Sequence, residues 1–427
     1  MEIRDPVHGS IPILDAEEDI IKHPFFQRLR NIKQLGFSEY VFPGATHTRY
    51  LHSIGVMNVS TLVFDFLFKN QTKDILRLKE TLRLGCLLHD IGHAPLSHST
   101  ESVMPMVSEL KLPKRFEIKN NRQATHEDYT IKSITDSSFT ESFKNVKSMF
   151  GIDPNAIAEL VIGETSDPGY FTVNGINYFP LLHQLVSSEM DCDRMDYLLR
   201  DSYFCGVSYG KFDLDWIIDN LKVCEIDQEA YLGISERAIS TFDDFLISRF
   251  HMFMMVYFHY RAVCLEQMLS RYFATSQEYT IPSDIEDYLD HDDPYLYKIL
   301  KKSNNHWAQR IVMNSIPRKI LETYGENYID QMDQLELYLK SENIDYIKCS
   351  STGRLSKYYN EESPQQRYPM KVMRESALNK KGIIKNIQDA TDLFQKYSES
   401  HAVNRIHCDF DTLTTKQQEN ILKIVQA

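Results

Sequence analysis

The spacing of apolar residues along the chain predicts a protein built mainly of helices. Between residues 53 and 68 apolar side chains recur every three or four positions, which is the pattern of a helix with one buried face. Similar patterns predict helices over residues 79–88, 156–162 and 181–200, and one unbroken helix over residues 240–272. Pro95 ends the helical element that begins at residue 79.

The strand patterns are shorter. Residues 1–15 alternate around a Pro-Val-His-Gly turn and predict a hairpin, and residues 223–234 predict a second strand pair. After residue 275 predicted helices and strand-like segments alternate. We therefore predict a mainly α fold, in which a helical catalytic domain with a small hairpin (residues 1–275) precedes a smaller mixed α/β region (residues 276–427). We expect the second region to serve oligomerisation or regulation.

Composition places the chain among ordinary globular proteins. It has 427 residues, of which 42% are hydrophobic and 25% charged, and a net charge of −13 that disfavours nucleic acid as a partner. Seven single cysteines and no signal peptide predict a cytoplasmic protein without a disulfide framework. The most apolar stretch, residues 245–269, is interrupted by charged residues and histidines, so no membrane span is predicted.

Four polar side chains in apolar surroundings predict a metal site. His52, the pair His89-Asp90 and Asp193 offer two imidazoles and two carboxylates, a set that suits a divalent ion and leaves coordination positions open. Adjacent residues share one ion only if the end of their helix points at it, and the break at Gly92 permits this. Each residue alone could be structural, but their coincidence favours a hydrolase site. Imidazole ligands indicate iron, manganese, cobalt, nickel or zinc, with magnesium as an alternative alongside substrate phosphates.

The chain resembles the HD-domain deoxynucleoside triphosphate triphosphohydrolases. The resemblance is carried by residues 5–9, 26–36, 42–53, 86–98, 191–201 and 249–259, and covers residues 1–265. It implies an HD core over about residues 48–200 and hydrolysis of a deoxynucleoside triphosphate (dNTP) to a deoxynucleoside and intact triphosphate, by attack of a metal-activated water on the α-phosphorus. It also implies a homo-oligomer, either a dimer or a tetramer.

The same resemblance implies roles for individual residues. The metal ligands would be His52, His89, Asp90 and Asp193. Protons at the scissile bond would be handled by His98, Glu101 and His126, with His93 beside the α-phosphate. Triphosphate contacts would come from Arg49, Arg194, Tyr197 and Arg249. Sugar contacts would come from Gln34 and Asp201 (to the 3′-hydroxyl) and from Leu35 and Tyr257 (a wall that excludes a ribose 2′-hydroxyl), with His259 near the base.

A regulatory nucleotide site is suggested by Arg4, Gln27 and Arg30. Arg4 and Lys22 replace an asparagine and an acid that recognise an activating guanine nucleotide in the mammalian members. Lys22 cannot accept hydrogen bonds from a guanine edge, so we expect a different activator or none. Two other functions remain open on the sequence: an HD phosphohydrolase acting on a nucleoside monophosphate or an alarmone, and a catalytically silent nucleotide sensor.

Overall fold

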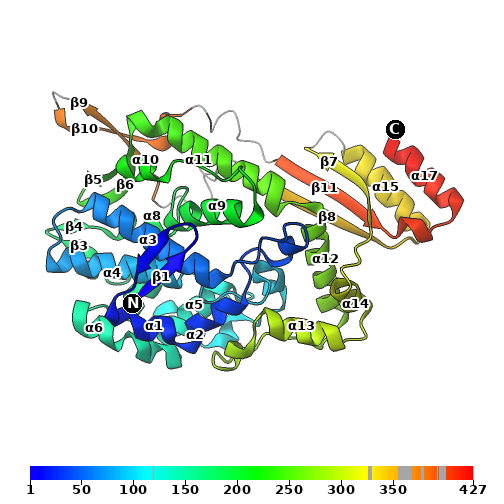
Figure 1. Ribbon diagram of the computed structural model, residues 1–427, viewed down its shortest axis with the longest axis horizontal. Coiled ribbons are helices and arrows are strands. Elements are labelled where there is room, and N and C mark those ends of the chain that lie inside the picture. Colours follow the sequence, from blue (N-terminus) through cyan, green and yellow to red (C-terminus); the bar gives the residue numbers. More distant parts are fainter. Residues whose placement is uncertain are drawn as a thin grey trace.

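The computed structural model describes residues 1–118, 120–325, 329–353, 368–376, 379–391, 393 and 401–426. Figure 1 shows a body of helices with short strands along one edge, from which a small sheet with two helices projects near the C-terminus. The predicted mainly α fold with an N-terminal hairpin and a mixed C-terminal region is confirmed.

The helices are α1 (Glu18–Lys22), α2 (Pro24–Arg28), α3 (Arg49–Leu67), α4 (Lys73–Leu88), α5 (His126–Thr135), α6 (Lys144–Phe150), α7 (Pro154–Ile162), α8 (Phe179–Val186), α9 (Cys192–Cys205), α10 (Leu214–Asp219), α11 (Ile239–Met252), α12 (Tyr260–Thr275), α13 (Asp293–Lys302), α14 (His306–Val312), α15 (Ile329–Ser341) and α17 (Thr415–Gln426). The strands are β1 (Glu2–Asp5), β2 (Gly9–Pro12), β3 (Thr172–Val173), β4 (Ile176–Asn177), β5 (Leu221–Ile226), β6 (Glu229–Ser235), β7 (Arg318–Tyr324), β8 (Tyr346–Gly353), β9 (Lys371–Ser376), β10 (Asn379–Asn386) and β11 (His401–Cys408).

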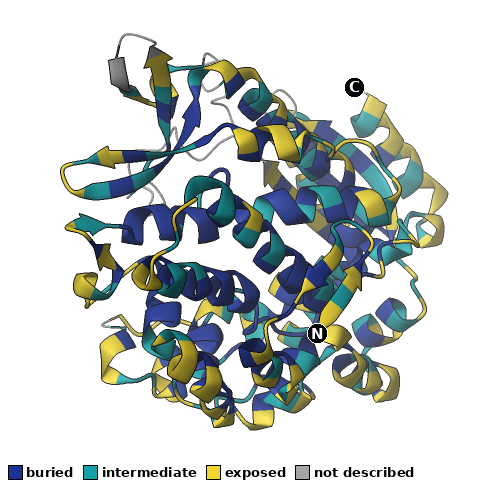
Figure 2. Cartoon of the chain, turned by 60° about the vertical axis from the view of Figure 1, so that its left-hand side comes forward, coloured by how far each residue is buried: buried dark blue, intermediate teal, exposed yellow. Residues whose placement is uncertain are grey.

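Helix α3 packs against α4 and α9 at the centre of the helical body. By length and composition α3 could cross a membrane, but 67% of its most apolar window is buried inside the protein, as expected of a core helix. Figure 2 shows in dark blue the buried residues that fill the interior of the helical body. Helices α4 and α9 each contribute buried residues to this interior. These three helices carry the predicted metal-binding residues or end next to them.

Strands of the C-terminal region lie in two different sheets. In one sheet, β9 runs parallel to β6 and antiparallel to β10, so residues 371–376 and 379–386 extend the sheet that contains the predicted 223–234 strand pair. In the other, β11 lies between β7 and β8. That sheet and helices α15 and α17 enclose a small core of Leu321, Met332, Leu335, Leu339, Ile406 and Ile421. The domain boundary near residue 275 stays a prediction.

Two helices predicted as continuous are broken, so these predictions are wrong. Residues 181–200 form parts of α8 and α9, because the Asp191 side chain accepts the backbone N–H of Arg194 at 2.7 Å and caps the start of α9. Instead of one helix over residues 240–272, the structure has α11, which ends at Met252, and α12, which begins at Tyr260. A π-helical turn at Phe253–Tyr257 lies between them.

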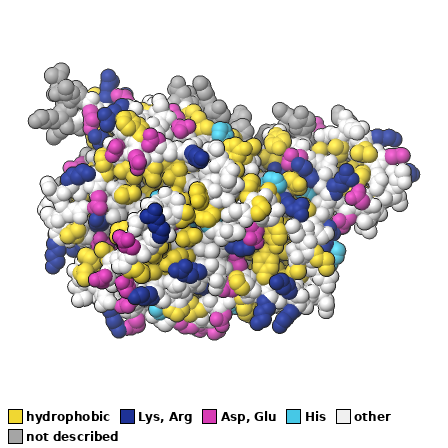
Figure 3. Space-filling view, viewed as in Figure 1, with side chains coloured by type: hydrophobic (Ala, Val, Ile, Leu, Met, Phe, Trp, Pro, Cys, Tyr) yellow, Lys and Arg dark blue, Asp and Glu magenta, His cyan; other side chains and the backbone are white. Residues whose placement is uncertain are grey.

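On the face seen in Figure 3, acidic and basic side chains are interspersed with apolar ones. Among the side chains coloured there, the basic residues form no continuous stripe across this face. This distribution differs from the extended basic surface on which general nucleic-acid binding depends.

Candidate metal centre and active-site cavity

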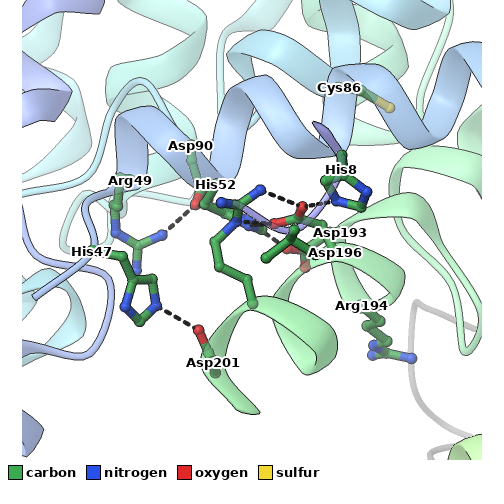
Figure 4. Close-up of polar contacts among 12 residues, drawn as sticks. His8, His47, Arg49, His52, Cys86, Asp90, Asp193, Arg194, Asp196 and Asp201 are labelled. Atoms are coloured by element: carbon green, nitrogen blue, oxygen red, sulfur yellow. Dashed lines mark hydrogen bonds and ion pairs between the residues drawn. The ribbon is translucent and has the colours of Figure 1, made fainter. Parts of the chain in front are cut away.

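Four side chains from three segments converge on one point. His52 comes from α3, and His89 and Asp90 follow directly after the end of α4. Asp193 lies in the first turn of α9. Figure 4 labels His52, Asp90 and Asp193 at this point. His52 Nε2 lies 2.9 Å from Asp193 Oδ1 and 3.7 Å from Asp90 Oδ2. His89 Nε2 lies 3.6 Å from Asp193 Oδ1 and 3.4 Å from Asp90 Oδ1. The sequence-predicted ligands are therefore brought together by the fold.

Both imidazoles direct Nε2 at this point, because their Nδ1 atoms are bonded elsewhere. His52 Nδ1 lies 2.8 Å from Asp196 Oδ2, and His89 Nδ1 lies 2.8 Å from the backbone oxygen of Cys86. A proton on Nδ1 leaves the lone pair of Nε2 available to a metal. Within the described part of the chain, neither buried Nε2 atom has a hydrogen-bond partner. A divalent ion would satisfy both atoms, so these residues fit a metal.

The electrostatics of the cluster favour positive charge. Burial lowers the pKa of His52, but the hydrogen bonds and negative charges of Asp193 and Asp196 outweigh this effect and raise the pKa to about 9. Burial also opposes a charge on His89, yet Asp90 and Asp193 raise its pKa to about 10. Burial works against ionisation of Asp193, but the two histidines hold its pKa well below the usual range. A metal that binds here would displace protons from the imidazoles.

A buried network behind His52 was not predicted from the sequence. The fully buried Asp196 accepts hydrogen bonds from His52, from His8 at 2.6 Å and from two nitrogens of Arg200, each at 2.8 Å. Arg200 also donates to Asp5 Oδ2 at 2.7 Å. The N-terminal hairpin thus helps to orient a predicted metal ligand. The sequence signals for this network were the four-residue spacing of Asp196 and Arg200 in a helix and the position of Asp5, His8, Asp196 and Arg200 in segments that carry the resemblance.

Gly55 permits the close approach of α3 and α9 at this network. A Cβ atom on Gly55 would lie 2.0 Å from Asp196 Oδ1 and 2.2 Å from Arg200 Nη2. Both neighbours are fully buried and held by ion pairs, so neither can move aside without breaking the network. Glycine is therefore required one helical turn beyond His52.

Asp90 is held from two further sides. Arg49 Nη1 forms an ion pair with Asp90 Oδ2, and His93 Nε2 lies 3.1 Å from Asp90 Oδ1. Arg49 Nε also donates to Ser97 Oγ at 2.9 Å. Burial, Arg49 and His126 all lower the pKa of His93, so this imidazole is neutral at pH 7. Arg49, one of the arginines predicted to contact triphosphate, therefore also neutralises the predicted metal ligand Asp90.

Three histidines and a glutamate form a second cluster beside the first. Glu101 Oε1 lies 2.6 Å from His126 Nδ1 and 3.1 Å from His98 Nδ1, and the His126 ring stacks on His93 with centroids 4.0 Å apart and planes 11° apart. The ligand atoms of all four residues lie within 4.8 Å of one another. The lone pairs of two parallel stacked rings lie in separate planes, however, so both rings cannot bond to one ion as they stand. This arrangement suits proton transfer better than metal binding.

Both clusters adjoin a cavity of about 460 Å³, within the ~300–1,000 Å³ typical of ligand sites. Its lining includes Gln34, Leu35, Arg49, His89, Asp90, His93, His98, His126, Asp191, Asp193, Arg194, Tyr197, Asp201 and Tyr257. Of the residues predicted to bind metal, handle protons or contact substrate, His52, Glu101, Arg249 and His259 lie outside the lining. His52 and Glu101 contact lining residues, whereas the His259 side chain caps α12 and meets Phe42 edge-on.

At the end of the cavity expected to bind the sugar, both oxygens of Asp201 are occupied. His47 Nε2 lies 2.7 Å from Asp201 Oδ1, and the Tyr257 hydroxyl donates to Asp201 Oδ2 at 2.7 Å. The buried Oε1 of Gln34 has no hydrogen-bond partner among the described residues. His47 was missed as a site residue, although it lies within the string that carries the resemblance. It fixes the orientation of Asp201.

Two of the three predicted phosphate-binding arginines, Arg194 and Arg249, meet at one carboxylate. Glu189 Oε2 accepts hydrogen bonds from Arg194 at 3.1 Å and from Arg249 at 2.7 Å. Burial raises the pKa of Tyr197 to about 12, so its phenol is a neutral donor beside them. No sequence signal pointed to Glu189.

The proposed regulatory residues lie outside the cavity lining. Gln27 accepts a hydrogen bond from Arg30 at 2.8 Å, and the Arg30 guanidinium lies 3.6 Å from the centre of the Tyr50 ring. Arg4 is exposed on β1. Their regulatory role stays a prediction.

Comparison with known proteins places this site in a family context. Residues 49–166 match the HD domain, and residues 212–347 match the HD associated region. An uncharacterized protein of Mycoplasma pneumoniae is 28% identical over 385 residues, which are 83% of this chain and 84% of that protein. YwfO of Bacillus subtilis, also uncharacterized, is 34% identical over 258 residues (60% of this chain, 51% of YwfO).

Among relatives of stated activity, the deoxynucleoside triphosphate triphosphohydrolase SAMHD1 of Homo sapiens is 28% identical over 291 residues. The match spans 65% of this chain but 45% of SAMHD1. The crystal structure of a hypothetical protein from Aquifex aeolicus is 26% identical, has a TM-score of 0.74 and covers 99% of both chains.

Proposed function

The chain belongs to the HD-domain phosphohydrolases related to the dNTP triphosphohydrolases, and on this premise we propose that it hydrolyses dNTPs to a deoxynucleoside and triphosphate. One observation carries the proposal: the Nε2 atoms of His52 and His89, which accept or donate no hydrogen bond within the described residues, converge with Asp193 at a cavity that arginines and histidines also line. A binding module without catalysis would not require this combination of a metal centre, cationic groups and a proton-transfer cluster.

His52, His89, Asp90 and Asp193 would hold the divalent metal. When bound, such an ion lowers the pKa of a water and polarises a phosphoryl oxygen. Arg49 and Arg194 line the cavity on either side of this centre and supply guanidinium groups for the phosphates. Fixed cationic groups of this kind stabilise the charge that develops in the transition state.

The leaving 5′-oxygen must receive a proton, and His126 is the residue arranged to supply it. Its Nδ1 lies 2.6 Å from Glu101, so the carboxylate stabilises the imidazolium and orients the ring. Burial opposes ionisation of Glu101, but hydrogen bonds from His126 and His98 hold its pKa well below the usual range. The charged form of Glu101 therefore persists at neutral pH, and His126 can act as the acid.

The sugar and base determine which nucleotide is accepted. Leu35 and Tyr257 line the cavity beside Asp201, in positions that support exclusion of a ribose 2′-hydroxyl. Gln34 offers a sugar hydroxyl its buried Oε1, which has no hydrogen-bond partner in the described part of the chain. We further propose a homo-oligomer, either a dimer or a tetramer, that works in the cytoplasm, where the seven free cysteines would stay reduced.

The proposal is tested by analysing reaction products. Purified protein and an Asp193→Ala variant are incubated with each dNTP and with Mn²⁺, Fe²⁺, Co²⁺, Ni²⁺, Zn²⁺ or Mg²⁺, and the products are separated by chromatography. We expect a deoxynucleoside and intact triphosphate from the wild type only. Orthophosphate or pyrophosphate as the product would instead assign a different phosphohydrolase, and dNTP binding without turnover under all conditions would assign a sensor.

A further inference from the structure

Glu189 lies in the short segment between α8 and α9 and contacts Arg194, which lines the cavity, and Arg249, which lies outside the lining. Its side chain is 4% exposed, and one oxygen, Oε2, receives both guanidinium groups. Arg194 comes from the first turn of α9 and Arg249 from the last turn of α11. A single buried carboxylate therefore joins cations from two different helices.

The neighbouring carboxylate of Asp191 has a different task. Its two oxygens accept the backbone N–H groups of Arg194 at 2.7 Å and Ser188 at 2.8 Å, which fixes the start of α9. Asp191 Oδ2 lies 3.7 Å from Arg194 Nε, beyond hydrogen-bonding distance. Glu189 is thus the carboxylate that accepts hydrogen bonds from the guanidinium groups of both arginines.

Glu189 is shared between two cations. Both guanidinium groups hydrogen-bond to this one carboxylate, Asp191 is a more distant ion-pair partner of Arg194 at 3.7 Å, and within the described chain the buried Nε of Arg249 has no hydrogen-bond partner. A buried guanidinium needs an opposite charge when no ligand provides one. A triphosphate supplies several anionic oxygens, and each guanidinium still has N–H groups to donate.

We propose that Glu189 is an internal counterion that stands in for substrate phosphate at Arg194 and Arg249 and thereby limits how tightly the cavity binds phosphate. This inference rests on the proposed function. Before the substrate binds, the carboxylate stabilises the two buried cations. Once phosphate is bound, the same negative charge repels it, so phosphate binds more weakly than two unshared arginines would allow.

The Glu189→Gln variant tests this, because it removes the charge and keeps a side-chain oxygen as acceptor. Inorganic tripolyphosphate is titrated into metal-loaded protein freed of excess metal, and kcat and KM are measured with each dNTP. We expect the tripolyphosphate Kd to fall about tenfold or more and KM for dNTP to fall with it. We also expect a lower melting temperature without ligand, and a larger rise on adding tripolyphosphate than in the wild type.

A matched control lies in the C-terminal sheet. Glu322 also joins two cations, Arg405 at 2.6 Å and Lys319 at 2.9 Å, on opposite sides of one carboxylate. Glu322→Gln should lower the melting temperature without changing the tripolyphosphate Kd or KM. A purely structural role for Glu189 predicts this same result for Glu189→Gln, and that result would overturn the inference.

The remaining outcomes are separable. Unchanged or weaker tripolyphosphate binding by Glu189→Gln, with dNTP turnover intact, overturns the inference and leaves the proposed function standing. Absence of both tripolyphosphate binding and dNTP turnover in the wild type overturns both. If Glu189→Gln does not fold, Arg249→Met is compared with the Arg249→Met/Glu189→Gln double variant. The inference requires that adding Glu189→Gln restores tripolyphosphate affinity lost in Arg249→Met. If the double variant binds tripolyphosphate no more tightly than Arg249→Met, the inference is overturned.

Discussion

Replacing Asp196 with asparagine should separate orientation of a metal ligand from direct metal binding. Asp196 is fully buried and receives four hydrogen bonds, from His52, His8 and Arg200. Asparagine has one acceptor oxygen in place of two, so its amide nitrogen must face either the His52 side or the His8 side of the network. In either orientation the neutral amide holds the Nδ1 proton of His52 less firmly than the carboxylate does, so the direction of Nε2 is less fixed.

The magnitude follows from two separate effects. Loss of a partner that orients a metal-binding histidine typically weakens metal affinity by roughly 10- to 100-fold, which is about 1.4–2.7 kcal/mol. Breaking a buried ion pair costs about 3–5 kcal/mol. We expect the lower end of this range because Arg200 retains its other ion pair, with Asp5 Oδ2 at 2.7 Å. Asp196→Asn should therefore lower the free energy of unfolding by about 3 kcal/mol.

The assay measures metal affinity by competition with a chelator and stability by urea unfolding. The matched control is Asp5→Asn, which removes the other ion-pair partner of Arg200 and leaves the contact between His52 and Asp196 intact. It should lower stability without the loss of metal affinity. Wild-type metal affinity in Asp196→Asn, or an equal loss of affinity in Asp5→Asn, would refute the reasoning.

Three further predictions follow from other parts of the structure. Burial raises the pKa of Glu80 to about 7, so the folded protein favours the protonated carboxyl and loses stability as the pH rises from about 4.5 to about 7. Relative to the wild type, Glu80→Gln should therefore become more stable with rising pH, by on the order of 2–3 kcal/mol at pH 8. Urea unfolding at several pH values measures this difference, and a difference that does not change with pH would contradict the prediction. Gly55→Ala should destabilise the protein by more than about 3 kcal/mol, because its Cβ meets Asp196, and a melting temperature near that of the wild type would disprove the clash. Glu101→Gln should slow dNTP turnover by roughly 10²-fold or more at unchanged metal content, because His126 loses its carboxylate, and unaltered kcat would remove that pair from the reaction.

The sequence predicted the groups that carry chemistry better than the groups that position them. His52, His89, Asp90 and Asp193 stand out because polar side chains inside apolar segments need a partner or a function. The position of His89 could also be predicted, because Gly92 and Pro95 end regular structure just beyond it. In the structure α4 ends at Leu88, so the histidine follows the helix directly.

The positioning groups could not be predicted, because their contacts depend on segments far apart in the chain. His8 and Asp196 are 188 positions apart, and their contact requires the hairpin to lie against α9. Glu189 reaches Arg249 only because residues 187–191 break the helix predicted over residues 181–200. In the C-terminal half, the parallel pairing of β6 with β9 joins strands more than a hundred residues apart, and local patterns do not encode such pairing.

The most direct test of the metal centre is anomalous diffraction from crystals of the protein grown with Mn²⁺ or Zn²⁺. We predict one strong peak about 2.0–2.2 Å from Nε2 of His52 and of His89 and from an oxygen of Asp90 and of Asp193. A protein that binds the metal stoichiometrically in solution yet shows its peak elsewhere, or shows none at these four side chains, would contradict the central claim.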